Sequence, residues 1–196
     1  MDLFMNGEKI DATLENEKTV GDILKSFELT CEENDAAVIG IIINGKNVTA
    51  DDFDEISKEE IKDSTKIEFS VVTKQTIADS FKKTADLFKK LEQEMKKIPV
   101  QFQNGKEKEA NLSIKSLADS IEDFCHIAAL ASLFKEYSIV SIDGKPFNDF
   151  FADFSPILSD FEQALKDNDT VTIGDLAEYE ICPRLQAIAE TLENLN

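Results

Sequence analysis

The chain contains no tryptophan and has two tyrosines and one histidine among its 196 residues. So few rings leave little on which nucleobases could stack. Lysine and arginine total 21 against 40 aspartates and glutamates, which gives a formal net charge of −19. Because a phosphate backbone is bound by basic surfaces, this charge balance argues against direct nucleic-acid binding.

Catalytic and metal-binding motifs are also missing. A Ser-His-Asp or Cys-His site would have to use His126, but the adjacent Cys125 points about 100° away from it on a helix. The glycines stand singly, so the chain has no phosphate loop, and no cysteine pair has the spacing of a zinc or redox motif. Residues 167–178 imitate a calcium loop, yet Val171 and Thr172 stand where a ligand and a glycine are needed. We therefore predict no catalytic residue, no metal site and no cofactor.

We predict neither a signal peptide nor a transmembrane segment from this sequence. The first residues lack a basic n-region, and the longest apolar runs are far too short to span a bilayer. An odd number of widely spaced cysteines fits reduced thiols, which we expect to be small buried residues. These cysteines are Cys31, Cys125 and Cys182. We expect a cytoplasmic, bacterial-type protein without membrane insertion.

The first 73 residues carry the pattern of a mixed α and β domain. Asn6-Gly7 and Asn44-Gly45 each adjoin strand-like runs and predict type I′ turns. Thr19 with Asp22 looks like a capping box that opens a helix, and Ser57 looks like a second one that opens a short helical turn over 57–60. The acidic cluster at 51–55 reads as a solvated loop. Strands are expected at 3–5, 8–12, 37–43 and 66–72. The run 37–43 is apolar on both faces and should be a central strand.

This order of hairpin, helix, central strand, short helix and strand resembles the β-grasp, or ubiquitin-like, fold. The likeness covers residues 1–73 and is greatest to the bacterial sulfur carriers, whose central strand and turn resemble residues 38–48. Sulfur carriers end in a free Gly-Gly that is activated on its carboxylate, whereas Val71-Val72-Thr73 runs on into further chain. The resemblance therefore implies a fold without the carrier chemistry.

Residues 74–196 are predicted to be all helical. Apolar residues recur at alternating spacings of four and three residues over 76–98, which predicts a first helix. Pro99 should end this helix, and residues 99–105 should form a connection. That seam is Ile77, Phe81, Thr84, Phe88, Leu91, Met95 and Ile98. A second helix has the seam Ala110, Ile114, Leu117, Ile121, Phe124, Ala128 and Ala131.

Two further helices follow the Asp143-Gly144 turn. Pro156 should split or kink the third helix, Thr172 should cap the fourth, and Pro183 should kink the fourth. The fourth is lined by Leu176, Tyr179, Leu185, Ile188 and Leu192. Short connections between such helices favour an antiparallel bundle. The predicted class is thus α+β, with a β-grasp-like domain at 1–73 and a four-helix bundle-like domain at 74–196.

Two features could bind a partner. One is an aromatic face, which either packs into the core or forms an exposed docking groove; it comprises Phe147, Phe150, Phe151 and Phe154. The other is a set of lysine pairs that recur every seven residues opposite the first seam; they are Lys82, Lys83, Lys89, Lys90, Lys96 and Lys97. We expect the first pair to serve the junction between the two domains, and the outer four to face solvent or a partner.

By elimination, the sequence predicts a non-enzymatic interaction or scaffold protein whose partner is another protein. Three alternatives stay open. The chain could be an export or assembly chaperone whose bundle cradles an apolar helix of a client. It could be an acidic mimic of nucleic acid that competes for a basic partner. It could also be an enzyme whose carboxylates the sequence does not place. A homodimer is a further open alternative.

Overall fold

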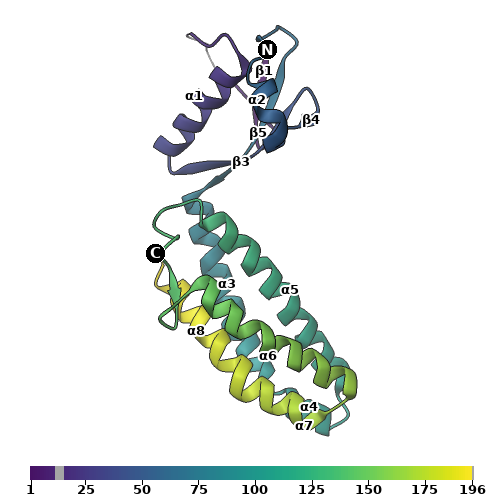
Figure 1. Cartoon of the computed structure of the whole chain (residues 1–196). Coiled ribbons are helices and arrows are strands. Elements are labelled where there is room, and N and C mark those ends of the chain that lie inside the picture. The colour runs from purple at the N-terminus through teal and green to yellow at the C-terminus, as the bar shows by residue number, and fades with distance from the viewer. Residues whose placement is uncertain (12–15, 196) are drawn as a thin grey trace. The chain divides into compact units, whose positions relative to one another are not determined.

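The structure is a computed structural model that describes residues 1–11 and 16–195 (Figure 1). The chain divides into two compact units, Met1–Thr76 and Ile77–Asn196. The elements up to the first long bundle helix are β1 (Asp2–Met5), β2 (Glu8–Ile10), α1 (Val20–Glu33), β3 (Ala36–Ile43), β4 (Lys46–Asn47), α2 (Ala50–Ile56) and β5 (Lys66–Thr73). Residue 12, where we predicted the second strand to end, lies outside the described residues.

The strands of the first unit form one sheet in the order β2-β1-β5-β3-β4. β1 pairs in parallel with β5, and the other neighbouring strands pair antiparallel. The middle strand is β5, and β3 lies between β5 and β4, so the prediction that residues 37–43 form a central strand with neighbours on both sides is confirmed. A β-bulge between Val38 and Gly40 interrupts the alternation of this strand: Val38 and Ile41 both pack against the core, while Ile39 is 45% exposed.

Both Asn-Gly turns form as predicted, with positive φ at both residues of each turn. The Asn6 side chain donates to the Val71 carbonyl at 3.0 Å and accepts from the Val71 N–H at 2.8 Å. The Asn44 side-chain oxygen accepts from the Lys66 N–H at 2.9 Å. The two asparagines therefore attach their hairpins to opposite ends of the middle strand.

Residues 57 and 58 form a turn that ends α2, so the prediction that Ser57 opens a helical turn over 57–60 is wrong. α2 starts after Thr49 and ends at Ser57, whose hydroxyl donates to the Phe53 carbonyl at 2.6 Å. The acidic cluster thus belongs to a helix and not to a loop, and its first acids lie where the helix dipole favours negative charge. The carbonyls of Ser57 and Glu59 accept from first-turn N–H groups of α1, which have no partner within their own helix.

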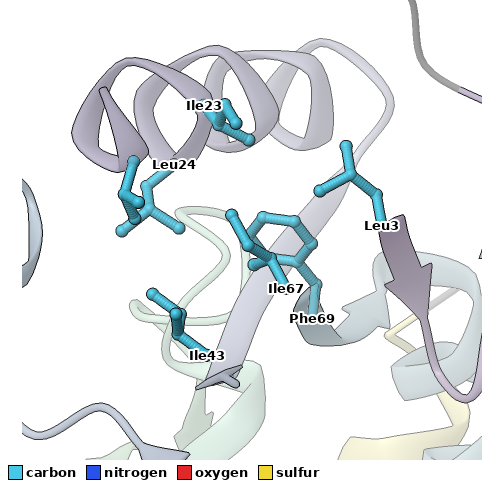
Figure 2. Close-up of a cluster of buried hydrophobic side chains, with 7 residues drawn as sticks. Leu3, Ile23, Leu24, Ile43, Ile67 and Phe69 are labelled. Atoms are coloured by element: carbon cyan, nitrogen blue, oxygen red, sulfur yellow. The ribbon is translucent and has the colours of Figure 1, made fainter. Parts of the chain in front are cut away.

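The core of the first unit lies between α1 and the sheet (Figure 2). The predicted capping box of Thr19 and Asp22 opens α1. The helix then turns its apolar side chains onto those of the strands. The buried cluster is Leu3, Val20, Ile23, Leu24, Ile43, Ile67 and Phe69. Phe27 stacks on Phe69 with ring centroids 3.7 Å apart.

The helical unit follows β5 without an intervening residue. Its elements are α3 (Lys74–Met95), α4 (Ile98–Gln103), α5 (Glu107–Ala131), β6 (Ser141–Ile142), β7 (Lys145–Pro146), α6 (Phe147–Asp167), α7 (Thr170–Asp175), η1 (Leu176–Ile181) and α8 (Cys182–Glu193). Figure 1 shows α3, α5, α6 and α8 side by side, with α4 and α7 together at one end. The protein is thus mixed α and β, with a five-stranded sheet followed by a set of packed helices.

The seam predicted for the first helix is confirmed, because all seven of its residues are buried; the first six lie on α3, and Ile98 begins α4. The seam predicted for α5 is confirmed at Ala110, Leu117, Phe124 and Ala131, which are buried, and is wrong at two isoleucines between them. Ser113 and Ser120 are buried, while Ile114 and Ile121 are only half-buried. The Ser113 hydroxyl donates to the Glu94 carboxylate at 3.3 Å, and the Ser120 hydroxyl donates to a backbone carbonyl one turn earlier. Satisfied in this way, the hydroxyls can lie in the core.

The prolines act differently from the prediction. Pro99 opens α4, so most of the predicted connection over 99–105 is helical. α6 continues unbroken through Pro156. Pro183 stands at the start of α8 and follows the π-helix η1, in which the Cys182 N–H bonds to the Ala177 carbonyl five residues back. Proline removes a helical donor, and the wider turn re-pairs the backbone. Because the π-helix shifts the helical phase, Tyr179 is 65% exposed instead of lining the core.

The two turn asparagines provide a matched test of the attachment to β5. We expect Asn6→Asp to destabilise the first unit by about 1 kcal/mol, because the Val71 carbonyl loses its amide donor. Asn44→Asp keeps the oxygen that accepts from Lys66, and should change stability little. Native-state hydrogen exchange at the β5 amides reports the opening of this unit. Equal losses in both variants would contradict the proposed attachment.

Candidate functional site: an apolar pocket in the helical unit

A hollow of about 550 Å³ lies among the helices of the second unit. We call it the bundle-end pocket. Residues of α3, α5, α6 and α8 line it, together with residues of the connection between α5 and α6. Its main lining residues are Phe81, Phe124, Cys125, Ala128, Tyr137, Ile139, Ile142, Phe147 and Leu192.

The connection after α5 forms one wall of this pocket because buried side chains hold it in place. Phe134 and Ile142 are 7% and 1% exposed. The Tyr137 ring meets the Phe81 ring edge-on, with centroids 5.3 Å apart. The predicted Asp143-Gly144 turn forms with positive φ at both residues and joins β6 to β7. The wall is therefore anchored to the core on both sides of its exposed residues.

The chemistry of the pocket is that of a binding site for neutral, apolar groups. Among the described residues that line it, none is acidic, basic or a histidine. The polar groups are three serine hydroxyls, one asparagine amide, the Tyr137 phenol and the Cys125 thiol. Burial raises the pKa of the Cys125 thiol, which keeps it protonated near neutral pH and weakly nucleophilic. These lining groups offer hydrogen bonds and contact surface without a general acid or base that titrates near pH 7.

The four phenylalanines of the predicted aromatic face belong mostly to the core. Phe150 and Phe154 are 5% and 0% exposed. Phe147 and Phe151 are half-buried, and their rings lie 5.6 and 5.8 Å from that of Phe124 on α5. Of the four, Phe147 alone lines the bundle-end pocket.

The six predicted lysines are all exposed on α3 or directly after it, and none lines the pocket. Lys89 forms an ion pair with Glu193 of α8, and Lys96 forms one with Glu92 of α3. Lys90 and Lys97 form no ion pair within the described residues, and neither do Lys82 and Lys83. The structure therefore separates lysines that the chain itself neutralises from lysines that it does not. The role of the first pair at a domain junction stays a prediction.

The remaining candidates have structural positions. His126 is exposed on α5 and does not line the pocket. Cys31 and Cys182 are buried, and burial raises the pKa of the Cys182 thiol to about 11. Asp169, and not Thr172, caps α7: its carboxylate accepts from the Thr172 N–H at 3.1 Å and hydroxyl at 2.6 Å. Over residues 1–11 and 16–195, no three potential ligands are grouped to hold a metal ion. In the same ranges no helix combines the length and apolarity needed to cross a membrane.

Fold and site together define an α+β protein of two units, with an apolar pocket in its helical unit. Residues 79–191, more than half of the chain, match the model of the domain of unknown function DUF8042, and the chain belongs to this family. Residues 1–73 match the model of the TP0873 N-terminal domain. An uncharacterized protein of Treponema pallidum (strain Nichols) is 20% identical over the whole chain and is covered to 98% of its own length. No solved structure matches the chain.

The sequence patterns do not predict this pocket, although several of its lining residues are predicted seam or aromatic positions. The available signal was a run of small residues at the end of α5. Ala128, Ala129, Ala131 and Ser132 all line the pocket. Small side chains at a helix end leave space, and the following segment either fills that space or covers it and leaves a cavity. Which of these occurs depends on the path of residues 132–140, and periodicity does not describe that path.

Thiol reactivity tests the placement of the three cysteines. We expect Cys125 to react first with 5,5′-dithiobis(2-nitrobenzoate) at pH 8, because the other two thiols are buried in cores. Cys125→Ser should remove the fast phase and leave two slow ones. Three equal rates in the folded protein would contradict the placement.

Proposed function

We propose that this chain is a non-enzymatic interaction protein that binds an apolar segment of a partner protein in the bundle-end pocket. The proposal is carried by the pocket itself. Its volume of about 550 Å³ and its apolar lining suit large aliphatic or aromatic side chains. The absence of a charged group among the described lining residues supports binding and not acid–base catalysis.

Exposed apolar side chains beside the pocket support a macromolecular partner. Ile139 lines the pocket and is 83% exposed, and Leu133 in the same connection is 53% exposed. Apolar surface that continues beyond a hollow is typical of protein interaction sites. The same surface favours, as second candidate, an export or assembly chaperone that cradles an apolar helix of its client. In both cases an apolar side chain enters the pocket while neighbouring residues cover the rim.

We also propose that the first unit is a β-grasp, ubiquitin-like domain and that the protein is cytoplasmic. The strand order β2-β1-β5-β3-β4, with parallel β1 and β5 and one helix on a face of the sheet, supports the fold. The three cysteines are free, which is consistent with a reducing compartment. For this family we infer that the sheet unit and the helical unit form a binding platform and do not catalyse a reaction.

Filling the pocket should abolish capture of the partner. A photo-crosslinking residue, p-benzoylphenylalanine, is introduced at the exposed Ile139, and crosslinks are mapped by mass spectrometry in the native cell. We expect one protein to be crosslinked through an apolar segment, and Ala128→Phe to reduce that crosslink by about tenfold or more because its ring occupies the pocket. Ala118→Phe is the matched control, since Ala118 is exposed elsewhere on the same helix.

Circular dichroism and melting temperature verify that both variants fold, and Ala128→Leu serves as a smaller filling change. A crosslink that survives both substitutions at Ala128 would contradict the proposal. A small apolar molecule retained in native mass spectrometry, with no protein crosslink, would assign the pocket to a metabolite instead.

A further inference from the structure

A second hollow lies between α3 and α5, on residues distinct from those of the bundle-end pocket. It measures about 210 Å³ and we call it the α3–α5 groove. Its lining residues are Lys83, Thr84, Leu87, Ser120, Asp123, His126 and Ile127. We propose that this groove binds an acidic amphipathic helix of a partner protein, with an apolar side chain in the hollow and carboxylates directed at the lysines of α3.

The apolar part of the groove is open to an incoming side chain. Leu87 is 38% exposed on α3, and Ile127 is half-buried on α5. Thr84 and Ser120 are buried beneath them at 8% and 5% exposure. A single leucine-sized side chain is the class of group that such a hollow accommodates, because a larger surface would meet the charged rim.

The cations stand on the same helical face as Leu87. Lys83, Leu87 and Lys90 are spaced four and three residues apart, so they neighbour one another along α3. The two lysines lie about 10.5 Å apart along the helix axis. On a partner helix, two carboxylates seven residues apart are separated by the same distance along the axis as these two lysines. The apolar residue between those carboxylates then faces Leu87.

The remaining charges support an acidic partner in one orientation. Lys89 and Lys96 are already paired with carboxylates of the chain, whereas Lys83 and Lys90 form no ion pair within the described residues. The hollow also holds one acid, Asp123, on the α5 side. Its charge repels carboxylates from α5 and directs them to α3. The net charge of −19 repels a nucleic acid or an anionic membrane more strongly than a short helix with a few acids.

The test uses the full chain and a synthetic 18-residue helical peptide with a leucine flanked by glutamates seven residues apart, labelled with tetramethylrhodamine. Binding is followed by fluorescence anisotropy at 50 and 300 mM sodium chloride. We expect binding that weakens with salt, and a Kd raised about fivefold or more by the double substitution Lys83→Gln and Lys90→Gln. Leu87→Gln should weaken binding at both salt concentrations.

The matched control is the double substitution Lys108→Gln and Lys115→Gln. These lysines are also seven residues apart and exposed, but lie on α5 outside the groove. We expect them to change the Kd less than twofold. Equal weakening by both doubles would show a general field effect and overturn the proposal. The proposal would also be overturned if the peptide did not bind, or if a peptide with glutamine in place of glutamate bound equally well. A third contradicting result would be single-stranded DNA, or vesicles of phosphatidylcholine and phosphatidylglycerol, whose binding depends on Lys83 and Lys90 as strongly as peptide binding does.

The groove and the proposed function fail independently. Ala128→Phe leaves the groove intact and should not change binding of the acidic peptide. The lysine substitutions likewise leave the bundle-end pocket untouched. A loss of peptide binding in Ala128→Phe would show that the two sites are one, and would overturn the inference as an independent site.

Discussion

One continuous stretch of chain, from the start of β5 to the end of α3, constrains both units. β5 pairs with two other strands of the sheet, in parallel with β1 and antiparallel with β3. α3 follows immediately and buries six of the seven residues of the predicted seam. Because no residue separates the two elements, the backbone that completes the sheet is also the backbone that begins the bundle. The boundary between the two units lies within α3, between Thr76 and Ile77.

The two hollows of the helical unit would bind the proposed partners through different physical interactions. The bundle-end pocket offers apolar contact, whose contribution depends on the area removed from water and hardly on salt. The α3–α5 groove adds Lys83, which forms no ion pair within the described residues and whose attraction for carboxylates is screened by salt. In a chain with nearly twice as many acids as bases, a local cationic face attracts an acidic partner only at short range. We infer that the apolar pocket would supply affinity and the groove would supply selectivity and orientation.

Local patterns predicted those elements whose pairing partners lie nearby in the chain. The Asn-Gly turns and the capping box of Thr19 formed as expected, since each depends on a few consecutive residues. The capping box predicted at Ser57 failed because carbonyls of that segment are taken by α1, more than thirty residues earlier. The predicted seam of α5 differs from the observed one at Ile114, because Glu94 gives the neighbouring Ser113 a hydrogen-bond partner, which makes a serine as acceptable in the core as an isoleucine.

The sequence by itself determined the fold class, the seam of α3 and the scarcity of catalytic groups, because composition and periodicity report these directly. It also located the lysines, whose spacing is a property of one helix. Only the tertiary structure decided that β5 and not β3 is the middle strand, and that Lys89 and Lys96 form ion pairs while Lys83 and Lys90 form none with the residues that the structure describes. The pocket likewise exists only in three dimensions, because its walls come from segments more than a hundred residues apart, from Phe81 to Leu192. Hollows and ion pairs between distant segments depend on how helices pack, and no local spacing encodes that.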